Sequence, residues 1–160
     1  MKKGGWNINW KVLIICILVL AFVGFTGSLF TQKSVSSSWY DSIRPSITPP
    51  NWVFPVVWNI LFLLIAFSLY FAWINARKKR KLTAVVYGVN FNLNMLWSML
   101  FFLFRNPSSA FYQIIVLWLS IVLMITYTWK IDRRASYLLV PYLLWVSFAS
   151  VLNFLAIRIL

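Results

Sequence analysis

Five long apolar segments, separated by short polar connections, constrain the fold more than any other feature of this sequence. They lie at about residues 12–30, 52–75, 82–104, 111–130 and 136–158. A helix needs about 20 predominantly apolar residues to cross a lipid bilayer, and each segment meets that length. The first segment is longer than the apolar core of a typical signal peptide, so we interpret it as a retained span. The sequence therefore predicts an all-α integral membrane protein, a bundle of five transmembrane helices forming one domain over residues 1–160.

The composition agrees with a membrane protein and excludes several functional classes. Hydrophobic residues make up 62% of the chain and charged residues 11%, against about 25% charged residues in a soluble domain. The chain has no His, two acidic residues and one cysteine, Cys16, which lies inside the first apolar segment. A disulfide framework, a zinc site and the usual catalytic triads are therefore excluded. We predict no metal site and no resident cofactor.

The basic residues predict the orientation of the bundle. The net charge of +13 would indicate nucleic-acid binding in a soluble protein, but here the Lys and Arg residues flank the apolar segments, so we expect no nucleic-acid partner. One side receives Lys2, Lys3, Lys11, residues 77–81, Lys130, Arg133 and Arg134, and the other Lys33, Arg44, Arg105 and Arg158. The positive-inside rule then places the N-terminus in the cytoplasm and the 31–51 connection outside, assuming a plasma membrane.

The 31–51 connection is the only long one, and long loops in compact folds are usually functional. Four prolines fall between residues 45 and 55, within the stretch from Trp39 to Trp58. Since proline fixes φ and lacks an N–H donor, we expect this stretch to be rigid and non-helical. A stiff aromatic loop beside an apolar helix indicates a lid over a cavity, and we assign to the lid Trp39, Arg44, Pro45 and Pro50. Arg44 has two candidate roles: pairing with a ligand carboxylate or reaching the bilayer interface.

Polar and aromatic residues share helical faces inside three of the apolar segments. These faces comprise Trp58, Phe62 and Ile65; Asn90, Asn94, Trp97 and Phe101; and Trp145, Ala149, Leu152 and Asn153. Two interpretations are open. The faces pack against one another, with the Asn amides bridging helices, or they line a pocket for a large planar apolar ligand. Because the chain has no His, metal-free porphyrin suits such a pocket better than ligated haem.

These residues also carry a resemblance to a known family. The motifs are Trp39-Tyr40, Arg44-Pro45, Thr48-Pro49-Pro50 and Val57-Trp58; Leu93-Asn94-x-x-Trp97-Ser98-x-x-Phe101-Phe102; and Leu139-x-Pro141-Tyr142-x-x-Trp145-x-x-Phe148-Ala149-x-x-Leu152-Asn153. In this order and over nearly the whole chain, they closely resemble the TspO/MBR family of translocator, or peripheral-type benzodiazepine receptor, and tryptophan-rich sensory proteins.

The resemblance implies a five-helix membrane receptor or sensor, linked to tetrapyrrole regulation, that binds porphyrins and isoquinoline- or benzodiazepine-type ligands. It implies that Tyr40 and Pro49 close the pocket and that Trp145 stacks across from Trp58. Phe62, Asn94 and Ala149 are implied as further lining residues, and we add Trp97 from its shared helical face with Asn94. Trp58 and Trp145 also match two tryptophans linked to light-dependent degradation of protoporphyrin IX, so such an enzyme is the alternative function. A porphyrin or sterol transporter ranks third, because five spans lack the inverted repeats of common carriers.

Two further features bear on partners. Family members that bind sterols have a Tyr followed by a basic residue near the C-terminus, whereas here Phe154 stands in the Tyr position before Arg158. A formal sterol pattern exists at Leu123, Tyr127 and Lys130, although such patterns are weak evidence, so sterol binding stays open. Ala84 and Gly88, four residues apart, predict either a homodimer seam or close packing within the bundle.

Overall fold

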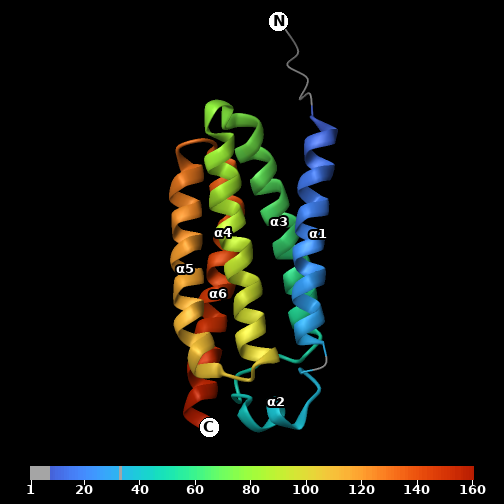
Figure 1. Ribbon diagram of the computed structural model, residues 1–160, viewed down its shortest axis with the longest axis vertical. Coiled ribbons are helices and arrows are strands. Elements are labelled where there is room, and N and C mark those ends of the chain that lie inside the picture. The colour runs from blue at the N-terminus through green and yellow to red at the C-terminus, as the bar shows by residue number, and fades with distance from the viewer. Residues whose placement is uncertain (1–7, 33) are drawn as a thin grey trace, which may run out of the picture.

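The computed structural model describes residues 8–32 and 34–160 (Figure 1). Its helices are α1 (Trp10–Thr31), α2 (Ser38–Ile43), α3 (Val53–Asn75), α4 (Arg80–Ser98), α5 (Pro107–Trp129) and α6 (Arg133–Ile159), with a 3₁₀ turn η1 (Arg77–Lys79) before α4 and a π-helical turn η2 (Met99–Leu103) after it. Within the described residues, five helices are long and apolar enough to cross a membrane, when α4 is counted together with its flanking turns. The predicted all-α bundle of five spans is confirmed.

The start of α5 differs from its predicted position, and the cause is local. Helix α5 begins at Pro107, four residues before the predicted start at residue 111. Asn106 caps it, because its side-chain oxygen accepts a hydrogen bond from the Ser109 N–H at 3.0 Å. Proline is favoured at the first helical position, where an N–H has no partner within the helix. Asn-Pro therefore starts a helix that hydropathy alone places later.

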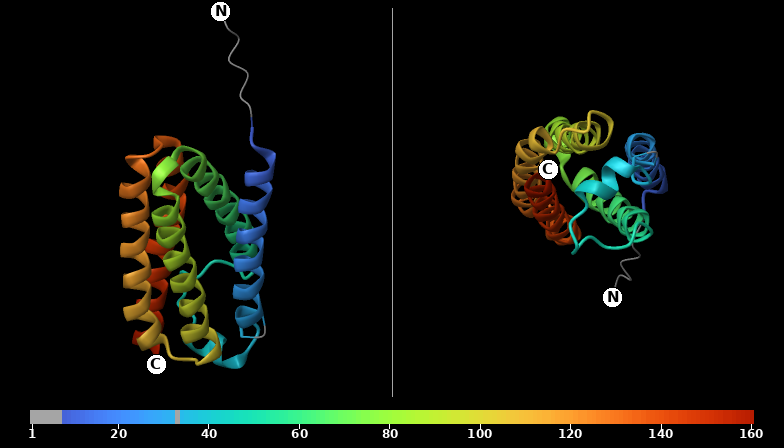
Figure 2. Two further views of the ribbon diagram at one scale, coloured as in Figure 1. Left: turned by 45° about the horizontal axis from the view of Figure 1, so that its top comes forward. Right: turned by 90° about the horizontal axis from the view of Figure 1, so that it is seen from below.

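The five long helices form a closed ring in the order α1, α3, α6, α5, α4 (Figure 2). The α3–α4 and α5–α6 turns lie at the same end as the start of α1, which we call the basic end; α2, the α4–α5 turn and the C-terminus lie at the other, which we call the lid end (Figure 1). The described cations of the basic end are Lys11, Arg77, Lys78, Lys79, Arg80, Lys81, Lys130, Arg133 and Arg134. Lys2, Lys3 and Lys33 lie outside the described residues. The expected grouping of the described basic residues is thus found, and the side that faces the cytoplasm stays a prediction.

Helices α1 and α3 approach closely at Gly24. A Cβ atom added at this position would lie 2.9 Å from the Phe62 ring of α3, closer than real Cβ contacts allow. Glycine is therefore required for the present position of that ring. Small residues are the usual means by which helix backbones approach one another in membranes.

The proline-rich lid contains a helix, which corrects the expectation of a wholly non-helical stretch. Helix α2 starts at Ser38 because the Ser37 hydroxyl accepts a hydrogen bond from the Tyr40 N–H. It ends at Ile43 because Arg44, which precedes Pro45, takes the extended conformation that proline imposes on the residue before it. Pro55 lies in the first turn of α3, where its missing N–H costs no helical hydrogen bond. Only residues 44–52 of the stretch are non-helical.

Helix α4 ends in a π-helical turn that the sequence did not predict. In η2 the Phe104 N–H bonds the Met99 carbonyl oxygen at 2.9 Å, five residues back. Arg105 then adopts a positive φ of 49°, which ends the helix. Single π-helical turns occur mostly inside or at the ends of α-helices and often at functional sites. Here the turn presents Phe101 and Phe102 to the lid.

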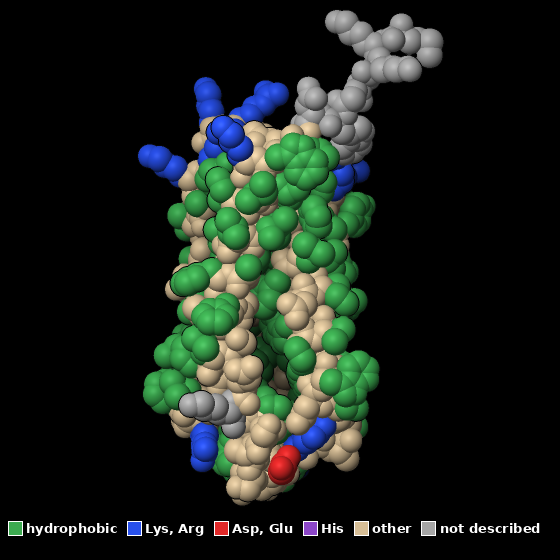
Figure 3. Space-filling model, turned by 90° about the vertical axis from the view of Figure 1, so that its right-hand side faces the viewer, with side chains coloured by type: hydrophobic (Ala, Val, Ile, Leu, Met, Phe, Trp, Pro, Cys, Tyr) green, Lys and Arg blue, Asp and Glu red, His purple; other side chains and the backbone are tan. Residues whose placement is uncertain are grey.

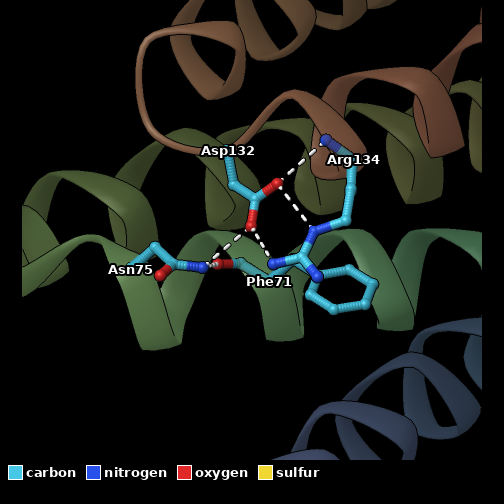
Figure 4. A network of polar contacts seen from close by, with 4 residues as sticks. All are labelled: Phe71, Asn75, Asp132 and Arg134. Atoms are coloured by element: carbon cyan, nitrogen blue, oxygen red, sulfur yellow. Dashed lines mark hydrogen bonds and ion pairs between the residues drawn. The ribbon is translucent and has the colours of Figure 1, made fainter. Parts of the chain in front are cut away.

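The basic end is joined by polar contacts between helices. The Ser68 hydroxyl of α3 bonds the Tyr87 hydroxyl of α4 at 2.6 Å and the Ala135 carbonyl oxygen of α6 at 2.7 Å. At the α5–α6 turn, Asp132 accepts hydrogen bonds from Asn75 at 2.8 Å and from the Arg134 guanidinium at 2.8 and 3.1 Å (Figure 4). These bonds connect three helices at one end of the ring.

Candidate functional site

The face of the bundle on which α1 and α3 lie is hollowed in its lid-end half (Figure 3). Seen along the bundle from the lid end, α2 crosses the ring of helices (Figure 2). The described lid segment, residues 34–52, thus lies at the end of the hollow. The sequence-predicted pocket residues come from the lid and from α3, α4 and α6, the elements that surround this half.

The lid is docked on η2 by aromatic rings. The Trp39 ring meets Phe101 edge-on and the Tyr40 ring tilts against Phe102, each at 5.9 Å between ring centres. The Arg105 guanidinium lies 5.7 Å from the centre of the Trp39 ring, a cation–π contact. These contacts hold α2 across the end of the bundle.

Arg44 has a role that neither sequence interpretation included. Its guanidinium donates a hydrogen bond to the Pro49 carbonyl oxygen at 2.7 Å and so closes the proline-rich loop on itself. Pro45 beneath it is buried, Pro49 is half-buried and Pro50 is exposed. Arg44 therefore stabilises the conformation of the lid through a hydrogen bond within it.

The Tyr40 hydroxyl has no hydrogen-bond partner among the described residues. Burial raises the pKa of its hydroxyl, and the Arg44 guanidinium offsets only part of that effect, so the group is neutral at physiological pH. The hydroxyl forms no hydrogen bond within the described part of the chain, although the Tyr40 side chain is buried. A neutral phenol in this state can donate to a ligand.

The predicted Asn face meets a tyrosine that the sequence analysis did not assign to the site. The Asn94 amide donates to the Tyr142 hydroxyl at 3.1 Å, and that hydroxyl donates to the Asn90 side-chain oxygen at 3.2 Å. The Asn90 amide in turn donates to Ser120 at 2.8 Å. Asn90 thus bridges helices, as the packing interpretation expects. The Asn94 side-chain oxygen has no partner among the described residues, so it can still accept a hydrogen bond.

Trp97 is anchored within the bundle. Its indole N–H donates to the Asn153 side-chain oxygen at 3.1 Å, and the Asn153 amide donates to the Pro107 carbonyl oxygen. The Trp97 ring also stacks on Phe101 at 5.4 Å between centres. These contacts favour a packing role for Trp97, while its half-buried ring is compatible with the predicted contact to a ligand.

Within the described residues the rings of Trp58 and Trp145 make no direct contact, and their predicted placement across from each other stays a prediction. Trp58 contacts Phe62 at 5.3 Å and Tyr142 at 6.2 Å between ring centres. Trp145 contacts Phe54 at 5.8 Å. Within the described residues neither indole N–H has a hydrogen-bond partner.

The surroundings of Trp145 differ from those of Trp58. Trp145 lines an apolar groove of about 410 Å³ between α3 and α6, with Val57, Ile60, Leu61, Pro141, Leu144 and Phe148. Because Ile60 and Leu144 are exposed, the groove opens on the outside of the bundle. Trp58 instead packs against the buried Tyr142. Ala149, one turn after Trp145, is half-buried against the core.

Ala84 and Gly88 lie on the outer face of α4. Ala84 is exposed, and a Cβ atom at Gly88 would meet nothing within 4 Å. Gly88 lines a shallow groove of about 490 Å³ together with Val85, Val89, Asn92, Leu93 and Leu96. Close packing within the bundle therefore does not explain these two residues, and the homodimer seam stays a prediction.

The comparisons with known proteins agree with this architecture. A sequence profile of the TspO/MBR family matches residues 15–158. The tryptophan-rich protein TspO of Archaeoglobus fulgidus is 41% identical over 148 residues, which cover 92% of this chain and 95% of the relative. TspO of Chlorobaculum tepidum is 39% identical over 155 residues, covering 96% and 98%. The tryptophan-rich sensory protein of Cereibacter sphaeroides is 29% identical over 154 residues, covering 96% and 94%. This chain belongs to the TspO/MBR family of integral, multi-pass membrane proteins.

Proposed function

We propose that the protein is a membrane receptor or sensor that binds porphyrins and similar planar hydrophobic ligands beneath its lid. The observation that carries this proposal is a set of polar groups without a hydrogen-bond partner among the described residues: the Trp58 indole N–H, the Tyr40 hydroxyl and the Asn94 side-chain oxygen. Buried or half-buried polar groups normally find a partner, and a ligand beside aromatic rings would supply one.

The hollow at the lid end and the family support the same assignment. A porphyrin is a flat, largely apolar ring system with carboxylate groups, which suits aromatic walls and a few hydrogen-bond donors. Isoquinoline- and benzodiazepine-type ligands share the flat apolar part and are proposed for the same site. The relative from Cereibacter sphaeroides is named a tryptophan-rich sensory protein, which supports a sensor. A link to tetrapyrrole regulation is part of the same proposal.

A titration with protoporphyrin IX tests the proposal. Detergent-purified protein is titrated in the dark while its tryptophan fluorescence is followed. We expect saturable quenching, and we expect Trp58→Phe to weaken binding by about tenfold, because the smaller ring loses both contact area and a donor. Trp10→Phe is the matched control, since Trp10 is 63% exposed and begins α1 at the basic end. Equal affinities of the Trp58→Phe variant and the wild type would refute the pocket assignment.

Illumination separates the sensor from the alternative, a light-dependent protoporphyrin IX-degrading enzyme. A porphyrin absorption band that stays constant in light would support the sensor. Loss of the band that requires both light and Trp145 would make the protein an enzyme. The only two acidic side chains of the sequence, Asp41 and Asp132, lie outside the five long helices, so the reaction would depend on the porphyrin and the indoles.

We further propose a homodimer formed through the outer face of α4. Gly88→Leu should convert dimer to monomer in a crosslinking assay in bilayers and leave the fold intact, because Gly88 lies on the outer face of α4 and a Cβ atom there meets nothing within 4 Å. A crosslinked dimer at wild-type yield would contradict this seam.

The proposed orientation places the basic end in the cytoplasm. It can be tested by replacing Cys16 with Ser and introducing Lys79→Cys, whose side chain is exposed at that end. Labelling by an impermeant thiol reagent added outside intact cells would overturn the orientation, and labelling only after lysis would support it.

A further inference from the structure

An exposed group of two cations and two aromatic rings surrounds the α5–α6 turn at the basic end. We call it the turn cluster, and its members are Trp129, Lys130, Arg133 and Tyr137. The Arg133 guanidinium lies 5.0 Å from the centre of the Trp129 ring, and the Tyr137 ring meets Trp129 edge-on at 5.5 Å. Trp129 is 43% exposed and Tyr137 61% exposed. The porphyrin site proposed above is at the opposite end of the bundle.

The carboxylate nearest to the turn cluster does not neutralise it. Asp132 is the only acidic residue in the described part of the basic end, and it already accepts hydrogen bonds from Arg134 and Asn75 (Figure 4). Arg133 contacts an aromatic ring but no hydrogen-bond acceptor within the described residues. A guanidinium has five N–H donors in a planar fork, so those of Arg133 remain available on a side chain whose position the Trp129 ring restricts.

The position of the turn cluster indicates what it contacts. Trp129 is the last residue of α5 and Tyr137 lies in the second turn of α6, so both rings lie where two membrane spans end. Exposed Trp and Tyr at such positions lie at the level of lipid headgroups. A guanidinium at that level faces lipid phosphates, which it can bind through two parallel hydrogen bonds.

The surrounding charge selects among lipids. Nine described Lys and Arg side chains lie at the basic end against one carboxylate. They attract a headgroup with net negative charge and repel the ammonium of a zwitterionic one. We propose that the turn cluster is a binding site for the phosphate of an anionic phospholipid, with Arg133 and Lys130 on the phosphate and Trp129 and Tyr137 against the glycerol and upper acyl region.

Native mass spectrometry of the full chain tests this site. Phosphatidylglycerol and phosphatidylcholine are titrated separately into detergent-solubilised protein, and the dissociation constant of the first bound lipid is measured for each. We expect tighter binding of phosphatidylglycerol, and a loss of about fivefold in Arg133→Gln, the size expected for one basic side chain at an anionic surface. Trp129→Leu, which keeps every charge, should lose part of the same preference, because Arg133 loses its support.

Two control variants remove the same charge elsewhere. Arg105→Gln removes a guanidinium that also lies over a tryptophan ring, but at the lid end. Lys78→Gln removes an exposed cation of the basic end outside the turn cluster. Both should retain the phosphatidylglycerol preference to within about twofold. A loss in Lys78→Gln equal to that in Arg133→Gln would overturn the site in favour of a diffuse field, and equal binding of the two lipids by wild-type protein would refute it outright.

A third arm separates lipid from free phosphate. Inorganic phosphate is added in excess, against sodium chloride of equal ionic strength. Phosphatidylglycerol should remain bound in both solutions, because the rings and the acyl chains contribute to its binding. Displacement by inorganic phosphate alone would show that the cluster binds phosphate ions and would overturn the lipid assignment.

Discussion

The two halves of the bundle differ in whether all their buried polar atoms form hydrogen bonds. In the basic-end half, Ser68, Tyr87, Thr128 and Ser136 are buried and all form hydrogen bonds with one another or with backbone carbonyls. In the lid-end half, the side-chain oxygens Thr48 Oγ1 and Gln113 Oε1 are fully buried without a partner, and they are the only such atoms in the described chain.

The halves also differ in packing. Hydrogen bonds from Ser68 connect α3, α4 and α6 near the basic end, whereas the face of α1 and α3 is hollowed near the lid end (Figure 3). An unpaired buried polar group costs about 1–3 kcal/mol, so a fold tolerates two in one half only where something offsets that cost. We infer that the basic-end half provides the stability and that the lid-end half is the half adapted to a ligand.

The strongest test of this comparison removes one hydroxyl from the basic-end half. Ser68→Ala leaves the buried Tyr87 hydroxyl and the Ala135 carbonyl oxygen without their shared partner. We expect a loss of about 2 kcal/mol in the free energy of unfolding, measured by titration with SDS in mixed micelles. Ser150→Ala is the matched control, since the Ser150 hydroxyl bonds only the Val146 carbonyl oxygen of its own helix. Equal losses in the two variants would contradict the assignment of stability to the basic-end half.

A smaller effect is expected from the ion pair at the α5–α6 turn, and it depends on pH. Partial burial raises the pKa of Asp132, but hydrogen bonds from the Arg134 side chain and N–H outweigh it, so the pKa lies below its ordinary value of 3.8. Stability from Asp132 is therefore present above that value and is lost as the pH falls through the folded-state pKa. Asp132→Asn should cost about 0.5–1 kcal/mol at neutral pH.

Thermal unfolding in a non-ionic detergent measures the contribution of Asp132 to stability. The difference in Tm between wild type and Asp132→Asn should shrink between pH 6 and pH 3, because protonation removes the charge that the substitution removes. Asp132→Ala should lose more at both values, since the Asp132 side chain also caps α6 by accepting from the Arg134 N–H. A difference in Tm that is independent of pH would exclude the charge as its cause.

The sequence predicted most of the fold because hydropathy and connection length are local signals. The five apolar segments can be identified directly from the hydropathy of the sequence. Short connections between them require successive helices to be antiparallel neighbours. The start of α5 and the helix α2 were missed for a different reason: both depend on capping residues, Asn106 and Ser37, whose effect outweighs hydropathy or proline content. The turn η2 has no sequence signal that we could name.

The candidate site was less predictable because side-chain partners depend on tertiary packing. The helical faces of Asn94 and Trp97 were identified from their spacing, but nothing in the sequence indicates that Tyr142 joins Asn90 to Asn94. The resemblance implies that Trp145 stacks across from Trp58, and that placement stays a prediction. The ring neighbours that the structure gives them, Phe54 and Tyr142, depend on how α3 packs against α6, which residue spacing within one helix does not determine.

The lid offers a kinetic test of the lid-end half. Pro49→Ala should make the exchange of bound protoporphyrin IX about threefold faster, because the loop gains backbone freedom while Arg44 can still bond the carbonyl oxygen of residue 49. Pro50→Ala, at an exposed neighbour, is the control and should change the exchange rate less. Stopped-flow displacement by excess ligand measures the rate. An unchanged rate in Pro49→Ala would show that the segment does not gate the site.

The smallest expected effect comes from two glycines that differ in their surroundings. Gly24→Ala places a Cβ atom 2.9 Å from the Phe62 ring, whereas Gly88→Ala places one where nothing lies within 4 Å. Both substitutions raise helix propensity by about the same amount, so the difference between the variants isolates the contact with Phe62. An aromatic ring can tilt to relieve such a contact, and a tilted Phe62 changes the wall of the proposed pocket.

We therefore expect Gly24→Ala to weaken binding of protoporphyrin IX by about twofold relative to Gly88→Ala, because overpacking a well-fitted site is unfavourable. The same fluorescence titration measures both variants. Helices α1 and α3 meet at Gly24 and Phe62, so tighter binding by Gly24→Ala would mean that the site is too wide for the ligand as it stands. Identical affinities would mean that Phe62 does not touch the porphyrin, and the ligand would then have to lie nearer to Trp58 and the lid than to α1.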